Sequence, residues 1–445
     1  MNNLQTNQNT LNLILTSLIF LGSFFFQSSV ISFKIIYAFQ VLIIFYFFIK
    51  YSGIKIDKQI VILNLAVLSL IFFKFDKSYI YLILICFLNT IFTFDKINRI
   101  NLKYNLILQL VFTIIMILCF KTTTIQNNNI TEWFLFDEIK NNYESYKACL
   151  IANENAILNN IPRFENCEFQ LKRLRYRFLD LHSNLTAIFC LIITYILLKD
   201  LKKKKFIFLY STFGLFFLYM TLSKSGLLFF LTILCLTFLN LNNKILLLLF
   251  FVFNFFLGII SYNFSSSVSN FWGKDTSAAQ NVYEQEFCPK IKNIPVIGYF
   301  NECNVEKNEY IQKMNENPQL LLFNIMGYST FYKLHSYGMV TESVLNNLRY
   351  YLFPNPLYQL EKNKIIDKKD INGKLSSHGL FFLVFLKYGI ILGTIFFINL
   401  YLFLKKISEK KLFIAFIFSS TFLSLDIFLL FPYFLLSMLI KSRYK

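Results

Sequence analysis

The sequence predicts an all-α polytopic membrane protein with about 12 transmembrane helices and a long extracytoplasmic loop between helices nine and ten. Two features predict this fold class. Of the 445 residues, 56% are hydrophobic and only 16% are charged, whereas soluble domains carry about 25% charged residues. The apolar residues also come in long blocks, close to the roughly 20 residues that a helix needs to cross a bilayer.

Twelve apolar segments are candidates for the transmembrane helices. Some of them are short for a full crossing, and the last two form either two spans or one re-entrant hairpin. The segments are 11–26, 30–49, 60–75, 79–94, 104–120, 185–198, 206–222, 227–239, 245–262, 380–404, 412–423 and 427–440.

The charges in the connections predict which side of the membrane each loop occupies. Short basic connections such as "KDLKKKKF" and "KKISEKK" follow the even-numbered segments, and a basic tail follows the twelfth. Because cytoplasmic loops concentrate Lys and Arg, both termini are expected in the cytoplasm and both long loops outside. The same distribution accounts for the net charge of +19 and argues against a nucleic-acid partner.

This topology divides the chain into three parts. Residues 1–121 form an N-terminal transmembrane scaffold with helices one to five, and residues 122–181 form the first extracytoplasmic loop. Residues 182–440 form a second membrane domain, which includes the extracytoplasmic loop 263–378. The second loop is too long for a simple connector and is expected to fold over the outer face of the membrane.

Each long loop contains one pair of cysteines. Because an oxidising compartment permits disulfides, we predict the bonds Cys149–Cys167 and Cys288–Cys303. Neither loop contains the Cys-x-x-Cys spacing of a zinc site, so no metal is expected.

All three histidines and several cations fall on the predicted outer side of the membrane. Each has an ordinary structural explanation, such as contact with lipid headgroups, snorkelling, helix capping or, for Arg349, a pair with Glu342. Together they suggest a cationic cavity at membrane level, where Arg grips a phosphate and an imidazole takes a proton. The residues are Arg173, Arg175, Arg177, His182, Lys224, His335, Arg349 and His378.

Three segments of the chain resemble the O-antigen ligase and polymerase superfamily of bacterial membrane glycosyltransferases. They occur in the order of the family pattern, and the long outer loop separates the second from the third. In "RYRFLDLHSNLTAIF" the matching positions are Arg175 or Arg177, Asn184 and Ala187. In "TLSKSGLL" Ser223 matches, and Lys224 stands in place of the usual Arg. In "SSHGLFFLVFLKYGIILG" the matches are His378, Gly389 and Gly393, and Gly379 stands in place of the usual Asn. The last two glycines, one helical turn apart, are expected to let a neighbouring helix approach.

The resemblance implies a GT-C-like transferase in the bacterial inner membrane that uses no cofactor. Its donor would be an undecaprenyl-pyrophosphate-linked glycan, and its acceptor a lipid A-core sugar or another polysaccharide at the periplasmic face. His378 would act on the acceptor hydroxyl as the catalytic residue. The pyrophosphate would be held by Arg175, Arg177, Lys224 and Arg349, with His182, Asn184 and Ser223 as further site candidates.

Three alternatives remain open from the sequence. The first is a polysaccharide polymerase of the same superfamily. The second is a flippase or transporter, for which broken helices and midplane charges would be expected, and Lys387 is the main residue of that kind. The third is an assembly protein with a large external loop, which would not need His378 or the outer cations.

Overall fold

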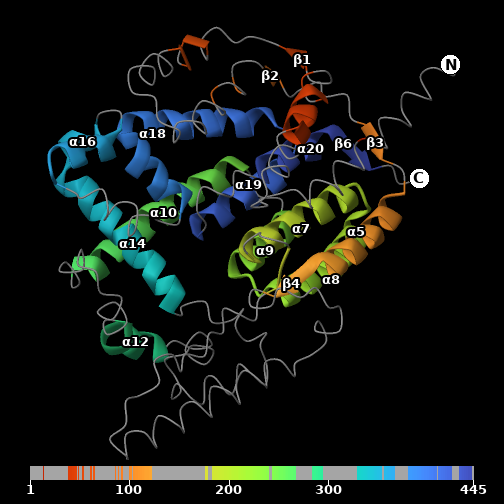
Figure 1. The fold of residues 1–445 in the computed structure, drawn as a ribbon, viewed down its shortest axis with the longest axis horizontal. Coiled ribbons are helices and arrows are strands. Elements are labelled where there is room, and N and C mark those ends of the chain that lie inside the picture. Colours follow the sequence, from red (N-terminus) through yellow and green to blue (C-terminus); the bar gives the residue numbers. More distant parts are fainter. Residues whose placement is uncertain are drawn as a thin grey trace, which may run out of the picture.

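In the computed structural model, most of the described residues lie in the second half of the chain. The residues that it describes are 14, 39–47, 49, 53–54, 61–62, 64–65, 86, 89, 92–93, 100–102, 104–122, 176–178, 183–239, 243–266, 283–293, 328–352, 355–365, 379–407, 409–422 and 430–442. This part of the protein is predominantly helical (Figure 1). The helical fold class expected from the apolar blocks is therefore confirmed. Most residues of the first four predicted spans lie outside the described part of the chain.

Eight of the predicted apolar segments coincide with helices in the described part of the chain. They are α5 (Asn105–Cys119), α7 (Ser183–Leu198), α8 (Lys203–Thr221), α9 (Lys224–Phe238), α10 (Asn243–Ser266), α18 (Leu380–Lys406), α19 (Lys410–Ser419) and α20 (Phe431–Leu439). A 3-10 turn, η8 (Ser420–Phe422), extends α19.

The predicted outer loop contains further helices: η5 (Tyr283–Phe287, a π-helix), α12 (Cys288–Lys292), α14 (Tyr328–Asn346), α15 (Leu348–Tyr351) and α16 (Pro356–Lys362). Short strands form three two-stranded ladders. They pair β1 (Gly53–Ile54) with β2 (Phe92–Thr93) and β4 (Phe120–Thr122) with β5 (Tyr176–Phe178), both antiparallel, and β3 (Ile100–Leu102) with β6 (Ile440–Ser442), parallel.

Within the described residues, one helix meets the length and hydropathy needed to cross a membrane. It comprises Leu380–Lys405, with a mean hydropathy of 2.3 over its most apolar window. Shorter apolar helices occur in α5, α7, α9 and α10. The expected number of about 12 transmembrane helices is thus not established by helix length alone.

Large apolar side chains are exposed along several helices. On α10, Leu248 is 62% exposed and Phe255 is 60% exposed, and on α8 Phe208 is 70% exposed. Water-soluble monomers rarely expose continuous apolar faces of this kind, because their contact with water costs free energy. Contact with lipid would remove that cost.

Hydroxyl groups in these helices bond to the backbone of their own helix. Thr221 Oγ1 donates to the carbonyl of Phe217 at 2.8 Å, and Thr237 Oγ1 donates to the carbonyl of Ile233 at 2.8 Å. A hydroxyl satisfied in this way needs no water, so the helices tolerate it in apolar surroundings.

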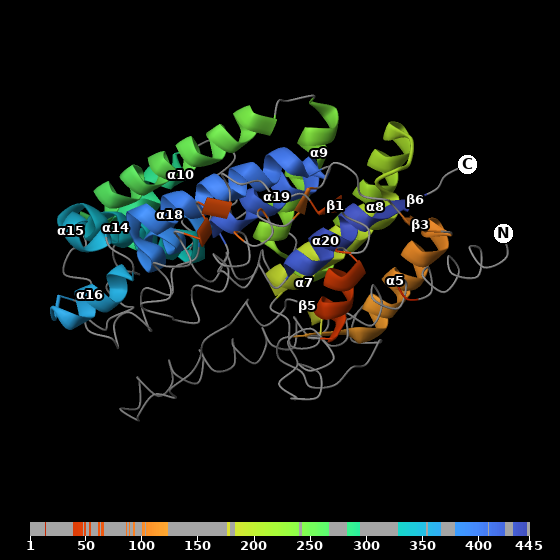
Figure 2. The same cartoon turned by 90° about the horizontal axis from the view of Figure 1, so that it is seen from above.

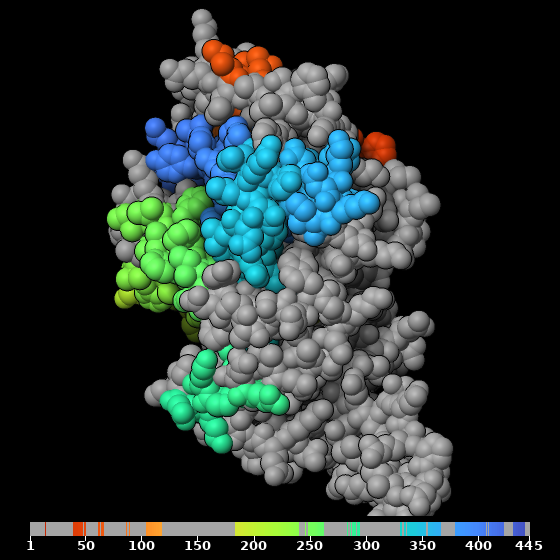
Figure 3. All heavy atoms as spheres, turned by 90° about the vertical axis from the view of Figure 1, so that its left-hand side faces the viewer, coloured from red at the N-terminus to blue at the C-terminus, as the bar shows by residue number. Residues whose placement is uncertain are grey.

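The described helices form two hydrophobic cores. The larger core contains side chains of α5, α7, α8, α9, α19, α20 and both halves of α18, with Phe250 of α10. Most of these helices gather on the right in Figures 1 and 2. The smaller core contains side chains of α14, α15, α16 and the first half of α18, with Leu257 of α10 packed against it. Figure 3, which views the left-hand side of Figure 1, shows α10 in green, α14–α16 in cyan and α18 in blue together on that side.

Helix α18 joins the two cores and is broken at Gly389. That residue has φ 77° and ψ −177°, which is not a helical conformation, and Figure 1 shows the two segments of α18 at an angle. A Cβ atom on Gly393 would lie 2.9 Å from Cδ1 of Phe385, which precedes the break. The two glycines therefore serve a fold-back within one helix, which corrects the expectation that they admit a neighbouring helix.

A Gly389→Ala variant is expected to be less stable than the wild type by roughly 1–3 kcal/mol, because only glycine readily adopts this backbone conformation. Thermal unfolding in detergent measures the effect. Thr394→Ala, at an exposed helical position of α18, is the matched control and should change stability little. Equal unfolding temperatures for Gly389→Ala and the wild type would contradict the break.

Candidate functional site

The first two segments that resemble the family meet at the N-terminal ends of α7 and α9. Ser223 Oγ donates a hydrogen bond to Asn184 Oδ1 at 2.8 Å. The same Ser223 oxygen accepts a hydrogen bond from the Gly226 amide at 2.9 Å, so Ser223 is the N-cap of α9. The N-cap serine thus ties the start of α9 to the start of α7.

Close packing supports this hydrogen bond. A Cβ atom on Gly226 would lie 2.7 Å from Cβ of Ala187, a separation that side chains do not reach. Glycine and alanine at these positions therefore let α7 and α9 approach closely, as small residues do in membrane helices. The turn between α8 and α9 contains only Leu222 and Ser223, and Leu222 adopts the left-handed conformation that ends α8.

Lys224 is the first residue of α9 and is half-buried. A cation at a helix N-terminus adds to the positive end of the helix dipole. Since α7 begins beside α9, the amides of two helix starts and the ammonium group of Lys224 combine in one region. This arrangement favours an anion, and a phosphate is a suitable one.

A Ser223→Ala variant is expected to lose roughly 1–2 kcal/mol of stability, because it removes the cap of α9 and leaves the Asn184 amide with one partner fewer. Thermal unfolding in detergent is the measurement. Thr212→Ala removes a hydroxyl that bonds only to its own helix, at the Phe208 carbonyl, and serves as the control. A smaller loss for Ser223→Ala than for Thr212→Ala would contradict the tie between α7 and α9.

The third resembling segment enters the described structure at Gly379, the N-cap of α18. Gly379 has φ 105° and ψ 113°, and a Cβ atom there would lie 2.8 Å from the carbonyl oxygen of Thr421. Asn, the usual family residue, would be both strained and too large at this position. The Gly-for-Asn departure therefore has a structural reason in this chain, while His378 itself lies outside the described residues.

Tyr337 of α14 packs beside Gly379 and contacts two neighbouring elements. Its hydroxyl donates a hydrogen bond to the Thr421 carbonyl, and its ring stacks on Phe382 with centroids 4.3 Å apart and planes at 9°. Burial raises the pKa of the Tyr337 hydroxyl well above its usual value, so the hydroxyl remains a donor at neutral pH. Helices α14, α18 and the α19 extension η8 are thereby fixed to one another at the N-terminal end of α18.

The predicted arginines are only partly described. Arg177 lies on β5, where its Cα partner is Lys121 of β4, and β5 contacts the helices α7 and α8; its side chain is not described. Arg349 is exposed on α15, and it forms no ion pair with Glu342, although both residues are described. Arg173, Arg175 and His182 lie outside the described residues.

Four of the eight cysteines lie among the described residues: Cys86, Cys190, Cys235 and Cys288. Cys288 is disulfide-bonded, whereas Cys86 and Cys190 are buried free thiols. The pairing Cys288–Cys303 stays a prediction because Cys303 is outside the described residues, as is the pair Cys149–Cys167. Among the described residues no group of three or more His, Cys, Asp or Glu is placed to hold a metal ion.

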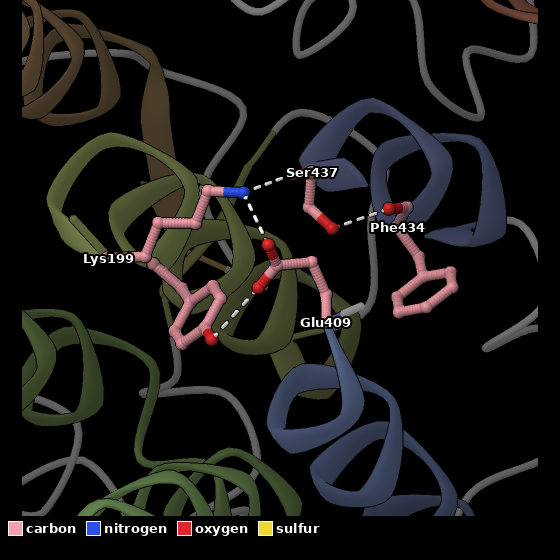
Figure 4. Close-up of polar contacts among 5 residues, drawn as sticks. Lys199, Glu409, Phe434 and Ser437 are labelled. Carbon is pink, nitrogen blue, oxygen red and sulfur yellow. Dashed lines mark hydrogen bonds and ion pairs between the residues drawn. The ribbon is translucent and has the colours of Figure 1, made fainter. Parts of the chain in front are cut away.

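A buried ion pair lies at the C-terminal end of α7, the end opposite to Asn184. The sequence analysis did not predict it. Lys199 Nζ lies 2.9 Å from Glu409 Oε1, and it also donates to the Ser437 carbonyl (Figure 4). The Tyr195 hydroxyl donates to the other Glu409 oxygen at 3.3 Å. The pair joins the end of α7 to the start of α19 and to α20. The one signal in the sequence was Glu409, the single acid in "KKISEKK".

Neither a protein-family model nor a curated protein nor a solved structure matches this chain.

Proposed function

We propose that this protein is a membrane glycosyltransferase of the O-antigen ligase type. It would move a glycan from undecaprenyl pyrophosphate to a lipid A-core or similar acceptor at the periplasmic face of the inner membrane. The observation that carries the proposal is the Ser223–Asn184 hydrogen bond, which joins two sequence segments that resemble the family and lie 39 residues apart. Lys224, the predicted pyrophosphate ligand, follows Ser223 as the first residue of α9.

The contacts between helix ends support a multi-pass topology with cytoplasmic termini. Asn184 and Ser223 are both predicted to lie outside, as are Gly379 and Thr421. Lys199 and Glu409 are both predicted to lie inside, where β3 also pairs with the C-terminal strand β6. Contacts between ends that are predicted on the same side are what alternating transmembrane helices require.

The reaction can be written with the residues of the site. The oxygen of an acceptor hydroxyl attacks the anomeric carbon of the donor sugar, and the bond from that carbon to the pyrophosphate breaks. Undecaprenyl pyrophosphate leaves with the bonding electrons, and His378 accepts the hydroxyl proton. Lys224, with Arg175, Arg177 and Arg349, would stabilise the negative charge on the leaving pyrophosphate.

A polymerase of the same superfamily would use the same chemistry with a lipid-linked repeat as the acceptor. A deletion strain separates these activities on a lipopolysaccharide gel. Loss of all O-antigen from the core indicates a ligase, and a single repeat on the core indicates a polymerase. An unchanged gel would overturn both.

A transporter or flippase is the second candidate, and the break in α18 favours it. Broken helices with nearby charges are typical of transporter binding sites, and Lys387 lies half-buried two residues before Gly389. Against it, the break folds α18 back on itself, with the rings of Phe385 and Phe397 5.6 Å apart across it, so the break also has a purely architectural cause.

The pyrophosphate role of Lys224 leads to a direct prediction. Lys224→Gln should lower the amount of glycan product by at least about tenfold, because the cation beside the leaving group is lost. Lys224→Arg should retain most of the product, since Arg is usual at this place in the family. Complementation of the deletion strain measures both, with Lys362→Gln, an exposed lysine of α16, as control. Full product from Lys224→Gln would contradict the assignment.

A further inference from the structure

The end of the helix bundle that contains Lys199 and Glu409 is densely basic. Asp200 and Glu409 are the carboxylates among the described residues 199–205 and 405–411, and Glu409 is engaged by Lys199. The lysines with described side chains around this ion pair are Lys202, Lys203, Lys204, Lys205, Lys405, Lys410 and Lys411.

Two of these lysines lie at the starts of different helices on either side of the ion pair. The Lys199–Glu409 pair, at 2.9 Å, holds the turn before α8 beside the turn before α19. Lys203 is the first residue of α8 and Lys411 is the second residue of α19. Burial lowers the pKa of Lys411, the positive charge of Lys203 lowers it further, and Glu409 opposes both effects.

The helix starts add to this positive charge. Neither α8 nor α19 has an acidic residue in its first turn or a side chain that caps its first amides. Glu409 is the N-cap residue of α19, but its carboxylate interacts with Lys199 and Tyr195 rather than with the helix amides. Lysines at such positions oppose the helix dipole, which favours anions there. Two lysines and two helix starts that converge in this way are complementary to a phosphate group.

Exposed apolar side chains border Lys203. Lys203 Nζ lies 6.0 Å from the centroid of the Phe238 ring, at the end of α9. Phe238 is 59% exposed and the following Leu239 is 52% exposed. A free phosphate ion gains nothing from contact with such an apolar surface, whereas the acyl chains of a phospholipid would cover it and remove it from water.

We propose that Lys203 and Lys411 bind the headgroup phosphate of an anionic phospholipid, whose acyl chains lie along Phe238 and Leu239. The site is separate from the candidate glycosyl-transfer site, because Lys203 and Phe238 are at the opposite ends of α8 and α9 from Ser223. The inference therefore stands whether or not the protein transfers glycans. Basic clusters beside the cytoplasmic ends of membrane helices recognise anionic lipids in this manner.

Native mass spectrometry of the purified full-length chain in detergent tests the proposal, with phosphatidylglycerol and phosphatidylcholine as probes. We expect the wild type to retain phosphatidylglycerol at least about tenfold more strongly than phosphatidylcholine. Lys203→Gln combined with Lys411→Gln should remove that preference. Lys203→Arg combined with Lys411→Arg should keep it, and so should the control Lys362→Gln.

Inorganic phosphate distinguishes a lipid site from a site for a free anion. Millimolar phosphate should leave bound phosphatidylglycerol in place, because it does not replace the acyl-chain contacts. Three results would overturn the proposal: equal retention of the two lipids by the wild type, an unchanged lipid preference in the Gln pair, or complete displacement of the lipid by phosphate.

Discussion

A His378→Ala variant is expected to leave no detectable glycan product, at an unchanged level of protein in the membrane. The imidazole would accept the proton of the attacking hydroxyl, and such positioned bases accelerate reactions by roughly a hundredfold to ten-thousandfold. A loss of this size reduces the product below the range of a lipopolysaccharide gel. The measurement is the gel together with an immunoblot of the membrane fraction.

His335→Ala is the matched control for this experiment. It removes an imidazole from the same predicted side of the membrane, on α14, and from a residue to which the proposed reaction assigns no step. We expect it to give product like the wild type. A normal amount of glycan product from His378→Ala would contradict the catalytic assignment. Equal losses of product from both variants would show that the effect is not specific to His378.

Replacement of Lys199 by Met is expected to destabilise the protein by roughly 3–5 kcal/mol, because it leaves the Glu409 carboxylate buried without its counter-charge. The side chains of the pair are only 4% and 9% exposed, so water cannot take over the lost interaction. The loss should appear as a large drop in the thermal unfolding temperature in detergent.

The double variant Lys199→Met with Glu409→Leu shows whether the loss comes from the unpaired charge. Replacement of both partners by apolar residues removes the cost of the buried charges, so most of the stability should return. Lys204→Met, at an exposed position on the same end of the bundle, should have little effect. A double variant no more stable than Lys199→Met alone would contradict the ion-pair explanation.

The sequence predicted the helices of the second half well because lipid-length apolar blocks have few other stable structures. Segment 185–198 corresponds to α7 and segment 227–239 to α9, each within a few residues. The sequence placed Asn184 and Ser223 among the site candidates but did not predict a contact between them. Its geometry, a serine that caps one helix and bonds the next, needed the structure.

Other features depend on tertiary contacts that a local pattern does not contain. The hydropathy of 380–404 is continuous, so nothing in it distinguished a straight helix from one that is broken at Gly389. The Lys199–Glu409 pair joins residues 210 positions apart. Gly379 was an unexplained departure from the family pattern until its φ of 105° and its contact with Thr421 were known.

The most direct test of the proposed function is transfer by the purified wild-type protein in proteoliposomes. The donor is an undecaprenyl-pyrophosphate-linked oligosaccharide, and the acceptor is lipid A-core. We predict that the acceptor gains the glycan and that one undecaprenyl pyrophosphate is released for each glycan transferred. Movement of the intact donor across the bilayer without any glycosylated acceptor would contradict the account and would instead indicate a flippase.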